Sequence, residues 1–126
     1  MVKTTKIKVI ILGAGKPKKG INHPALDHDF NKKSVLEWLI EAYSYTSQNI
    51  LFVGGYKIDD IINQNTTLKY TINPKWSTSS SVASLLCVNL KEDSDYFISY
   101  SDVVYRKELV HKMKNTEGDI ILAIDS

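Results

Sequence analysis

Cysteine is nearly absent from the sequence, which excludes folds held together by disulfides. Cys87 is the only cysteine among 126 residues, so the chain can form no internal disulfide. A chain without disulfides suits a reducing compartment, and we expect a cytoplasmic protein. Cys87 stands among apolar residues at helical spacing, and we expect it to be a buried small side chain.

Long hydrophobic runs are also missing. The apolar run at residues 9–12 follows a basic start and ends at Gly13, whereas a transmembrane helix needs about 20 apolar residues. We therefore interpret this run as a β-strand, and we expect no association with a membrane.

The chain has no large excess of charge of either sign. The chain has 16 Lys+Arg against 14 Asp+Glu, a formal net charge of +2, which gives no reason to expect a nucleic-acid partner. Arg106 is the only arginine. Any anion site must therefore use lysine side chains and backbone N–H groups.

Short β-branched segments alternate with segments of helical periodicity, a pattern typical of a parallel sheet covered by helices. The predicted strands are residues 6–12, 49–53, 68–72, 96–100 and 119–124. The predicted helices are residues 34–45, 57–63, 78–90 and 106–114. We expect an α/β fold, a Rossmann-like three-layer sandwich with a mainly parallel sheet, in one domain over residues 1–126.

The predicted boundaries rest on local signals. Ser34 is expected to cap the first long helix, with Glu37 completing a capping box. Thr78 or Ser79 is expected to cap the third helix. Because no helix follows the last predicted strand to cover the sheet, we expect this chain to be the N-terminal part of a larger α/β domain, the alternative being an unusually minimal one.

The turn Gly13-Ala14-Gly15 follows the first predicted strand. In open α/β sheets, ligands bind at the carboxyl ends of strands, where small residues let backbone N–H groups approach phosphate oxygens. Lys16 and Lys19 add positive charge nearby. The loop continues to about residue 32, and loops of this length without regular structure are usually functional. These features predict a phosphate-binding loop, the alternative being a simple glycine turn beside solvated lysines.

Two common phosphate-binding motifs do not match this loop. A dinucleotide fingerprint requires a third glycine where Lys18 stands, and a P-loop requires Lys-Ser/Thr where Ile21-Asn22 follows Gly20.

Residues 9–15, with the sequence VIILGAG, resemble the opening strand and glycine-rich loop of the nucleotidyltransferases that make activated sugars and CDP-alcohols. Further segments resemble this family in the same order along the chain: residues 23–26, 34–42, 52–57, 73–85 and 98–104. Residues 73–85 are similar to a segment typical of choline-phosphate and phosphonate cytidylyltransferases. Ser101-Asp102-Val103 resembles the family's Gly-Asp-Val metal-binding turn.

The resemblance implies a nucleotide-binding half of such an enzyme. The implied reaction transfers CMP from CTP to a small phosphorylated or phosphonylated acceptor, releases pyrophosphate and uses Mg²⁺. Lys16 and Lys19 are the implied catalytic residues, and Asp102 is the implied metal ligand. The implied nucleotide-binding residues are Leu12, Gly13, Ala14, Gly15, Lys16, Gly54, Gly55, Thr78, Ser79 and Ser84.

The sequence also departs from the family pattern. Lysines stand where the first loop usually carries an arginine, Ala25 replaces a motif lysine, and Ser101 replaces the glycine before the metal-binding Asp. Two alternatives therefore stay open: a non-catalytic nucleotide-sensing domain of the same fold, and an unrelated Rossmann-like or response-regulator-like module. The alternative for Asp102 is a turn or helix-capping residue, and the sequence leaves homo-oligomer formation open.

Overall fold

Four parallel strands form a single sheet in the computed structural model, which describes residues 6–28, 32–44, 49–91 and 94–123. The strands are β1 (Lys6–Gly13), β2 (Ile50–Gly54), β3 (Lys69–Ile72) and β4 (Ser94–Tyr100). Their order is β3-β2-β1-β4, and every neighbouring pair is parallel. This Rossmann-like α/β arrangement confirms the predicted fold class.

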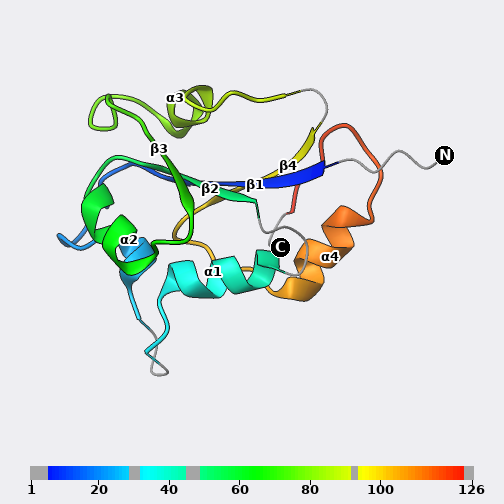
Figure 1. The fold of residues 1–126 in the computed structure, drawn as a ribbon, viewed down its shortest axis with the longest axis horizontal. Coiled ribbons are helices and arrows are strands. Elements are labelled where there is room, and N and C mark those ends of the chain that lie inside the picture. Colours follow the sequence, from blue (N-terminus) through cyan, green and yellow to red (C-terminus); the bar gives the residue numbers. More distant parts are fainter. Residues whose placement is uncertain (1–5, 29–31, 45–48, 92–93, 124–126) are drawn as a thin grey trace.

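Helices cover both faces of the sheet, as Figure 1 shows. The helices on one side are α1 (Val35–Ser44), α2 (Ile58–Gln64) and α4 (Lys107–Lys114), and the short α3 (Ser81–Leu86) lies on the other. A 3₁₀ turn, η1 (Pro24–Leu26), lies in the long loop after β1.

The alternation of side chains along β1 divides the core between these two faces. Val9 and Ile11 join the larger buried cluster beneath α1, α2 and α4. Ile10 and Leu12 join Val53 in a smaller cluster on the α3 side. β1 is buried on both faces, so its carboxyl end is a firmly held base for a binding turn.

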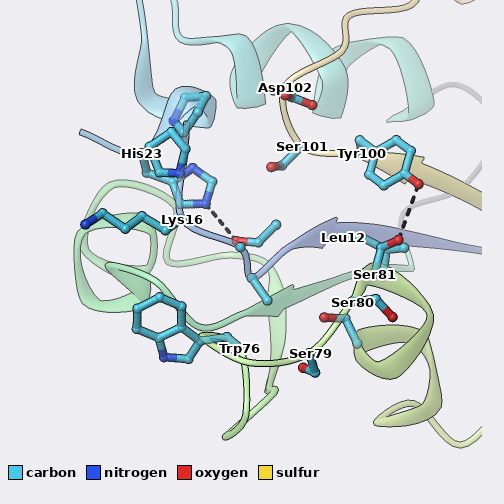
Figure 2. A pocket seen from close by; sticks show the side chains of 16 residues that line it. Leu12, Lys16, His23, Trp76, Ser79, Ser80, Ser81, Tyr100, Ser101 and Asp102 are labelled. Carbon is cyan, nitrogen blue, oxygen red and sulfur yellow. Dashed lines mark hydrogen bonds between the residues drawn. The ribbon is translucent and has the colours of Figure 1, made fainter. Parts of the chain in front are cut away.

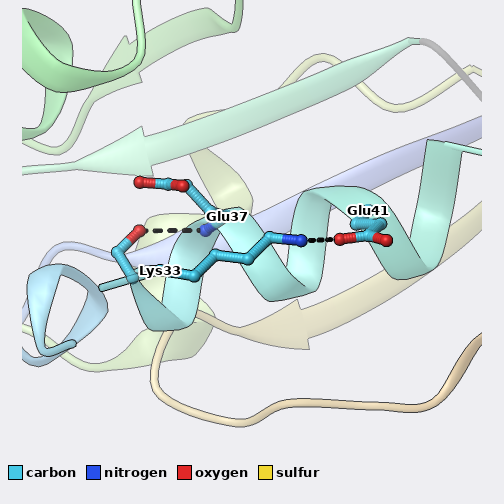
Figure 3. A network of polar contacts seen from close by, with 4 residues as sticks. Lys33, Glu37 and Glu41 are labelled. Carbon is cyan, nitrogen blue, oxygen red and sulfur yellow. Dashed lines mark hydrogen bonds and ion pairs between the residues drawn. The ribbon is translucent and has the colours of Figure 1, made fainter. Parts of the chain in front are cut away.

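The predicted cap of α1 is confirmed. Ser34 is fully buried, and its Oγ accepts a hydrogen bond of 3.1 Å from the Glu37 backbone N–H (Figure 3). The Lys33 ammonium pairs with the Glu41 carboxylate and lies 4.1 Å from the centroid of the Trp38 ring. These contacts fix the point at which the long loop enters α1.

The predicted third helix is too long. α3 begins after Ser80, because Ser79 donates its hydroxyl to the Lys75 carbonyl at 2.6 Å and so closes a turn before the helix starts. The helix ends at Cys87, which is exposed. The expectation of a buried Cys87 is therefore wrong, because so short a helix leaves part of its surface uncovered.

The predicted fifth strand is wrong over its described part, since residues 119–123 form no strand. Ile124 lies outside the described residues. Ile120 and Leu122 are 84% and 76% exposed. β-propensity yields a strand only where the segment pairs with a sheet edge, and this segment pairs with none of the described strands.

Within the described ranges, no helix combines the length and the apolar character that crossing a membrane requires.

Candidate functional site

A cleft of about 220 Å³ opens at the carboxyl ends of β1 and β4 (Figure 2). Eight of the predicted site residues line it: Leu12, Gly13, Ala14, Gly15, Lys16, Ser79, Ser84 and Asp102. Eight further residues line it without having been predicted: Pro17, His23, Pro24, Trp76, Ser80, Ser81, Tyr100 and Ser101. The structure thus brings four separate segments of the sequence, within residues 12–17, 23–24, 76–84 and 100–102, to one cavity.

Four predicted site residues do not line this cleft: Lys19, Gly54, Gly55 and Thr78. A Cβ at Gly54 would overlap Ile58, and one at Gly55 would come within 2.5 Å of Trp76. Both glycines are therefore needed for packing. Thr78 is exposed, and its hydroxyl lies 3.5 Å from the Lys75 carbonyl in the turn before α3.

Residues 12–16 form one side of the cleft, which we call the glycine wall. Three successive carbonyls of this wall accept hydrogen bonds from three different parts of the chain. The pairs are Leu12 with the Ser101 N–H (3.0 Å), Gly13 with His23 Nε2 (2.7 Å) and Ala14 with the Tyr56 N–H (2.8 Å). The wall is therefore held from three directions.

The N–H groups of the glycine wall are in the opposite situation. Those of Ala14, Gly15 and Lys16 donate to none of the residues that the structure describes. A turn whose carbonyls are occupied and whose N–H groups are free favours an anion over a cation. Lys16 adds a positive charge to the same wall, and its side chain is exposed.

Ser79, Ser80, Ser81 and Ser84 form the facing side, which we call the serine wall (Figure 2). Asn73, which is buried, holds two of these residues: its Nδ2 donates to the hydroxyls of Ser79 and Ser84 at 3.0 Å each. The Asn73 backbone N–H donates to the Gly54 carbonyl at 2.8 Å, which ties the wall to β2. Sequence reasoning did not assign Asn73 a role; its signal is the Asn-Pro step directly after β3.

Asp102 follows β4 and carries an exposed carboxylate on the cleft. Within the described ranges, no cluster of three or more His, Cys, Asp or Glu side chains could hold a metal ion. Mg²⁺ that arrives with a phosphate ligand needs only one or two protein carboxylates, and Asp102 fits that requirement.

His23 is the buried titratable group of the cleft. Burial lowers the pKa of its imidazole below the usual value of 6.5, against smaller opposing effects from the hydrogen bond to Gly13 and the charges of Asp102 and Asp27. At neutral pH the ring is uncharged. It therefore supplies hydrogen bonds to the cleft and no positive charge.

Trp76 and Tyr100 bound the cleft with aromatic side chains. Trp76 is half-buried and packs edge-on against Tyr56, with ring centroids 5.5 Å apart. The Tyr100 hydroxyl lies 3.4 Å from the Ser81 hydroxyl, so β4 and the serine wall meet at this point.

Comparison with known proteins gives one informative similarity. Over 107 residues the chain is 27% identical to a CTP:phosphoglutamine cytidylyltransferase from Campylobacter jejuni. The chain is thus similar to a cytidylyltransferase. This similarity supports a cytidylyltransferase-like nucleotidyltransferase family without selecting a member.

The matched region covers 77% of this chain and 42% of the Campylobacter protein. The chain therefore spans less than half the length of this curated relative. No protein-family model matches the sequence.

Proposed function

We propose that the cleft binds CTP and that the protein transfers CMP to a small phosphorylated or phosphonylated acceptor with release of pyrophosphate. The observation that carries this proposal is the glycine wall: the carbonyls of Leu12, Gly13 and Ala14 accept hydrogen bonds, while the N–H groups of Ala14, Gly15 and Lys16 donate to no residue that the structure describes. Similarity to a cytidylyltransferase supports the choice of reaction.

The triphosphate is assigned to the glycine wall. Backbone N–H groups of Ala14, Gly15 and Lys16 would donate to its phosphate oxygens. The Lys16 ammonium would neutralise charge that builds up on the leaving pyrophosphate. Lys19 lies further along the loop and does not line the cleft, so we assign the larger role to Lys16.

The base is assigned to the serine wall. A cytosine edge presents both a donor and acceptors, and hydroxyl groups can act as either. Ser80 and Ser81 offer two such groups along one side of the cleft, whereas the Ser79 hydroxyl already donates to the Lys75 carbonyl and accepts from Asn73. Their rotatable hydroxyls would let the wall match the pattern of the base.

Asp102 would hold Mg²⁺ together with the phosphate oxygens of the nucleotide. When bound, this ion supplies Lewis-acid stabilisation of the phosphate charge. In the proposed reaction an acceptor oxygen forms a bond to the α-phosphorus while the bond from that atom to the bridging α–β oxygen breaks. Both reactants are anions, so the chain contributes mainly alignment and charge neutralisation.

One experiment tests this proposal directly. Thermal unfolding is followed with each of the four common nucleoside triphosphates and Mg²⁺, together with pyrophosphate release on addition of phosphocholine or 2-aminoethylphosphonate. We expect CTP to raise the melting temperature by several degrees, and more than the other three nucleotides. Absence of a shift with every nucleotide contradicts the proposal and leaves an unrelated Rossmann-like module.

The Asp102→Asn variant is expected to lose the part of the CTP effect that depends on Mg²⁺. Asp95→Asn is the matched control, because Asp95 is an exposed carboxylate at the other end of the same strand. Equal losses in the two variants would argue against a role for Asp102 in the cleft.

A second candidate function is nucleotide sensing without transfer. It is favoured by Ala25, which stands where the related enzymes have a lysine and which is fully buried in this structure. Sensing predicts CTP binding without pyrophosphate release at comparable protein concentration.

A further inference from the structure

His23 has a role in the cleft that neither the sequence motifs nor the proposed chemistry assigns. It is buried at 2% exposure, whereas His28 and His111 are exposed. Its ring has two aromatic neighbours, with centroid separations of 6.1 Å to Phe52 and 6.5 Å to Tyr56. The Tyr56 ring is nearly parallel to it, at an interplanar angle of 29°. The orientation of the imidazole is thus set by packing.

The hydrogen bonds of His23 define which nitrogen carries the proton. Nδ1 accepts a hydrogen bond of 3.1 Å from the Ala25 backbone N–H, so Nδ1 has no proton. Nε2 lies 2.7 Å from the Gly13 carbonyl oxygen, which can only accept. The ring is therefore the neutral tautomer with its proton on Nε2, and this N–H donates to Gly13.

The bond to Gly13 also fixes the peptide unit that continues into the glycine wall. In a planar trans peptide the carbonyl and the following N–H point in opposite directions. With the Gly13 carbonyl turned to His23, the Ala14 N–H must point away from the imidazole. Figure 2 shows His23 on one side of the turn and Ser79 and Ser80 on the other.

We propose that His23 is a positioning residue for nucleotide binding, which holds the Gly13–Ala14 peptide unit so that the Ala14 N–H faces the ligand. The inference rests on the proposed function, because the ligand it serves is the triphosphate. A donor that is already oriented loses little freedom when the phosphate arrives. His23 therefore acts on the nucleotide through Gly13 and need not touch it.

Two substitutions separate this role from a general structural one, because each keeps one hydrogen bond of the ring. His23→Gln places an amide N–H near the position of Nε2 and can still donate to Gly13. His23→Asn places an acceptor near Nδ1 and can still accept from Ala25, but its side chain is too short to donate to the Gly13 carbonyl. Binding of CTP with Mg²⁺ is measured by calorimetric titration of the wild type and both variants.

We expect His23→Asn to weaken CTP binding about tenfold, as the loss of one orienting hydrogen bond implies. His23→Gln is expected to stay within about threefold of the wild type, because one weaker donor still holds the carbonyl. Equal affinities of the two variants, whether unchanged or equally weakened, overturn the positioning role. If the wild-type protein binds no nucleoside triphosphate, the proposed function is wrong, and this inference, which rests on it, is wrong as well.

The ¹⁵N spectrum of the wild-type imidazole is a second measurement, which decides the question even if both variants fail to fold. We expect a protonated Nε2 and an unprotonated Nδ1 at neutral pH. A proton on Nδ1 in the folded protein contradicts the hydrogen bond on which the proposal depends.

Discussion

The two walls of the cleft are held in different ways. The glycine wall ends a strand that is buried on both faces, and its carbonyls are bonded to three separate segments. In the serine wall the Asn73 side chain holds the hydroxyls of Ser79 and Ser84, and Ser79 and Ser80 are exposed. Fixed backbone donors suit a phosphate chain that every nucleotide shares, whereas rotatable hydroxyls suit a base that differs between nucleotides. The difference predicts that substitutions in the two walls change stability and ligand binding in different ways.

The largest effect is expected from Gly13→Ala, which disturbs the base of the glycine wall. The new Cβ would overlap the buried Phe52 ring and lie 2.8 Å from the Ser101 hydroxyl. We expect the free energy of unfolding to fall by about 3 kcal/mol, as in other overpacked cores. Urea denaturation measures it.

Gly15→Ala is the control for that change, because its Cβ meets no atom within 4 Å. Its stability is expected to stay within about 0.5 kcal/mol of the wild type. Equal stabilities of the two alanine variants would contradict the packing role of Gly13.

The next largest effect is expected from Asn73→Ala, which removes the support of the serine wall. The buried Ser84 hydroxyl loses its donor, and the free energy of unfolding should fall by about 2 kcal/mol. CTP binding should weaken about tenfold, while binding of inorganic tripolyphosphate, which has no base, should not change. Asn89→Ala, at an exposed position, is the control. Equal weakening for both ligands would show that the walls are not separate.

Lys16→Ala tests the glycine wall, and here we expect binding of both ligands to weaken. Removing this ammonium should weaken CTP and tripolyphosphate alike, each about fivefold, because a partly screened lysine contributes about 1 kcal/mol to phosphate binding. Lys18→Ala is the matched control, since Lys18 is exposed on the same loop and does not line the cleft. A loss confined to CTP, or an equal loss in the Lys18 variant, would count against the assignment.

The smallest effect concerns the dependence of stability on pH. Burial lowers the pKa of His23 in the folded state below 6.5, despite the opposing charges of Asp102 and Asp27. The unfolded chain therefore takes up a proton first as the pH falls. Stability is greatest above pH 6.5 and decreases below it, until the pH reaches the lowered pKa of the folded state.

His23→Gln should flatten the stability curve just below pH 6.5. Chemical denaturation of the wild type and the variant at a series of pH values measures it. A wild-type curve that is flat in this window would contradict the buried, neutral state of His23.

Features fixed by neighbouring residues could be predicted from the sequence. The end of β1 at a glycine turn and the Ser34 cap on Glu37 follow from short-range preferences, and both are confirmed. The parallel direction of the strands follows from the alternation of strands and helices, whereas their order does not, because β4 pairs with β1 and not with β3.

Features fixed by contacts between residues further apart could not be predicted from the sequence. His23 and Asn73 act on Gly13 and Ser84, which are 10 and 11 residues away in the sequence, and no local pattern marks either pair. Gly54 and Gly55 were expected to face a ligand, but Ile58 and Trp76 occupy the space beside them. The isoleucines near residue 120 have strand propensity, but among the described residues their segment pairs with neither edge strand of the sheet, β3 or β4.

An amide-resolved NMR titration with CTP and Mg²⁺ tests most directly whether this cleft binds a nucleoside triphosphate. We expect the largest ¹H–¹⁵N shift changes at Ala14, Gly15 and Lys16, smaller ones at Ser79–Ser84, and none on α4 at the opposite side of the sheet. Saturating nucleotide that leaves the amides of the glycine wall unchanged, or that shifts α4 instead, would contradict the binding site.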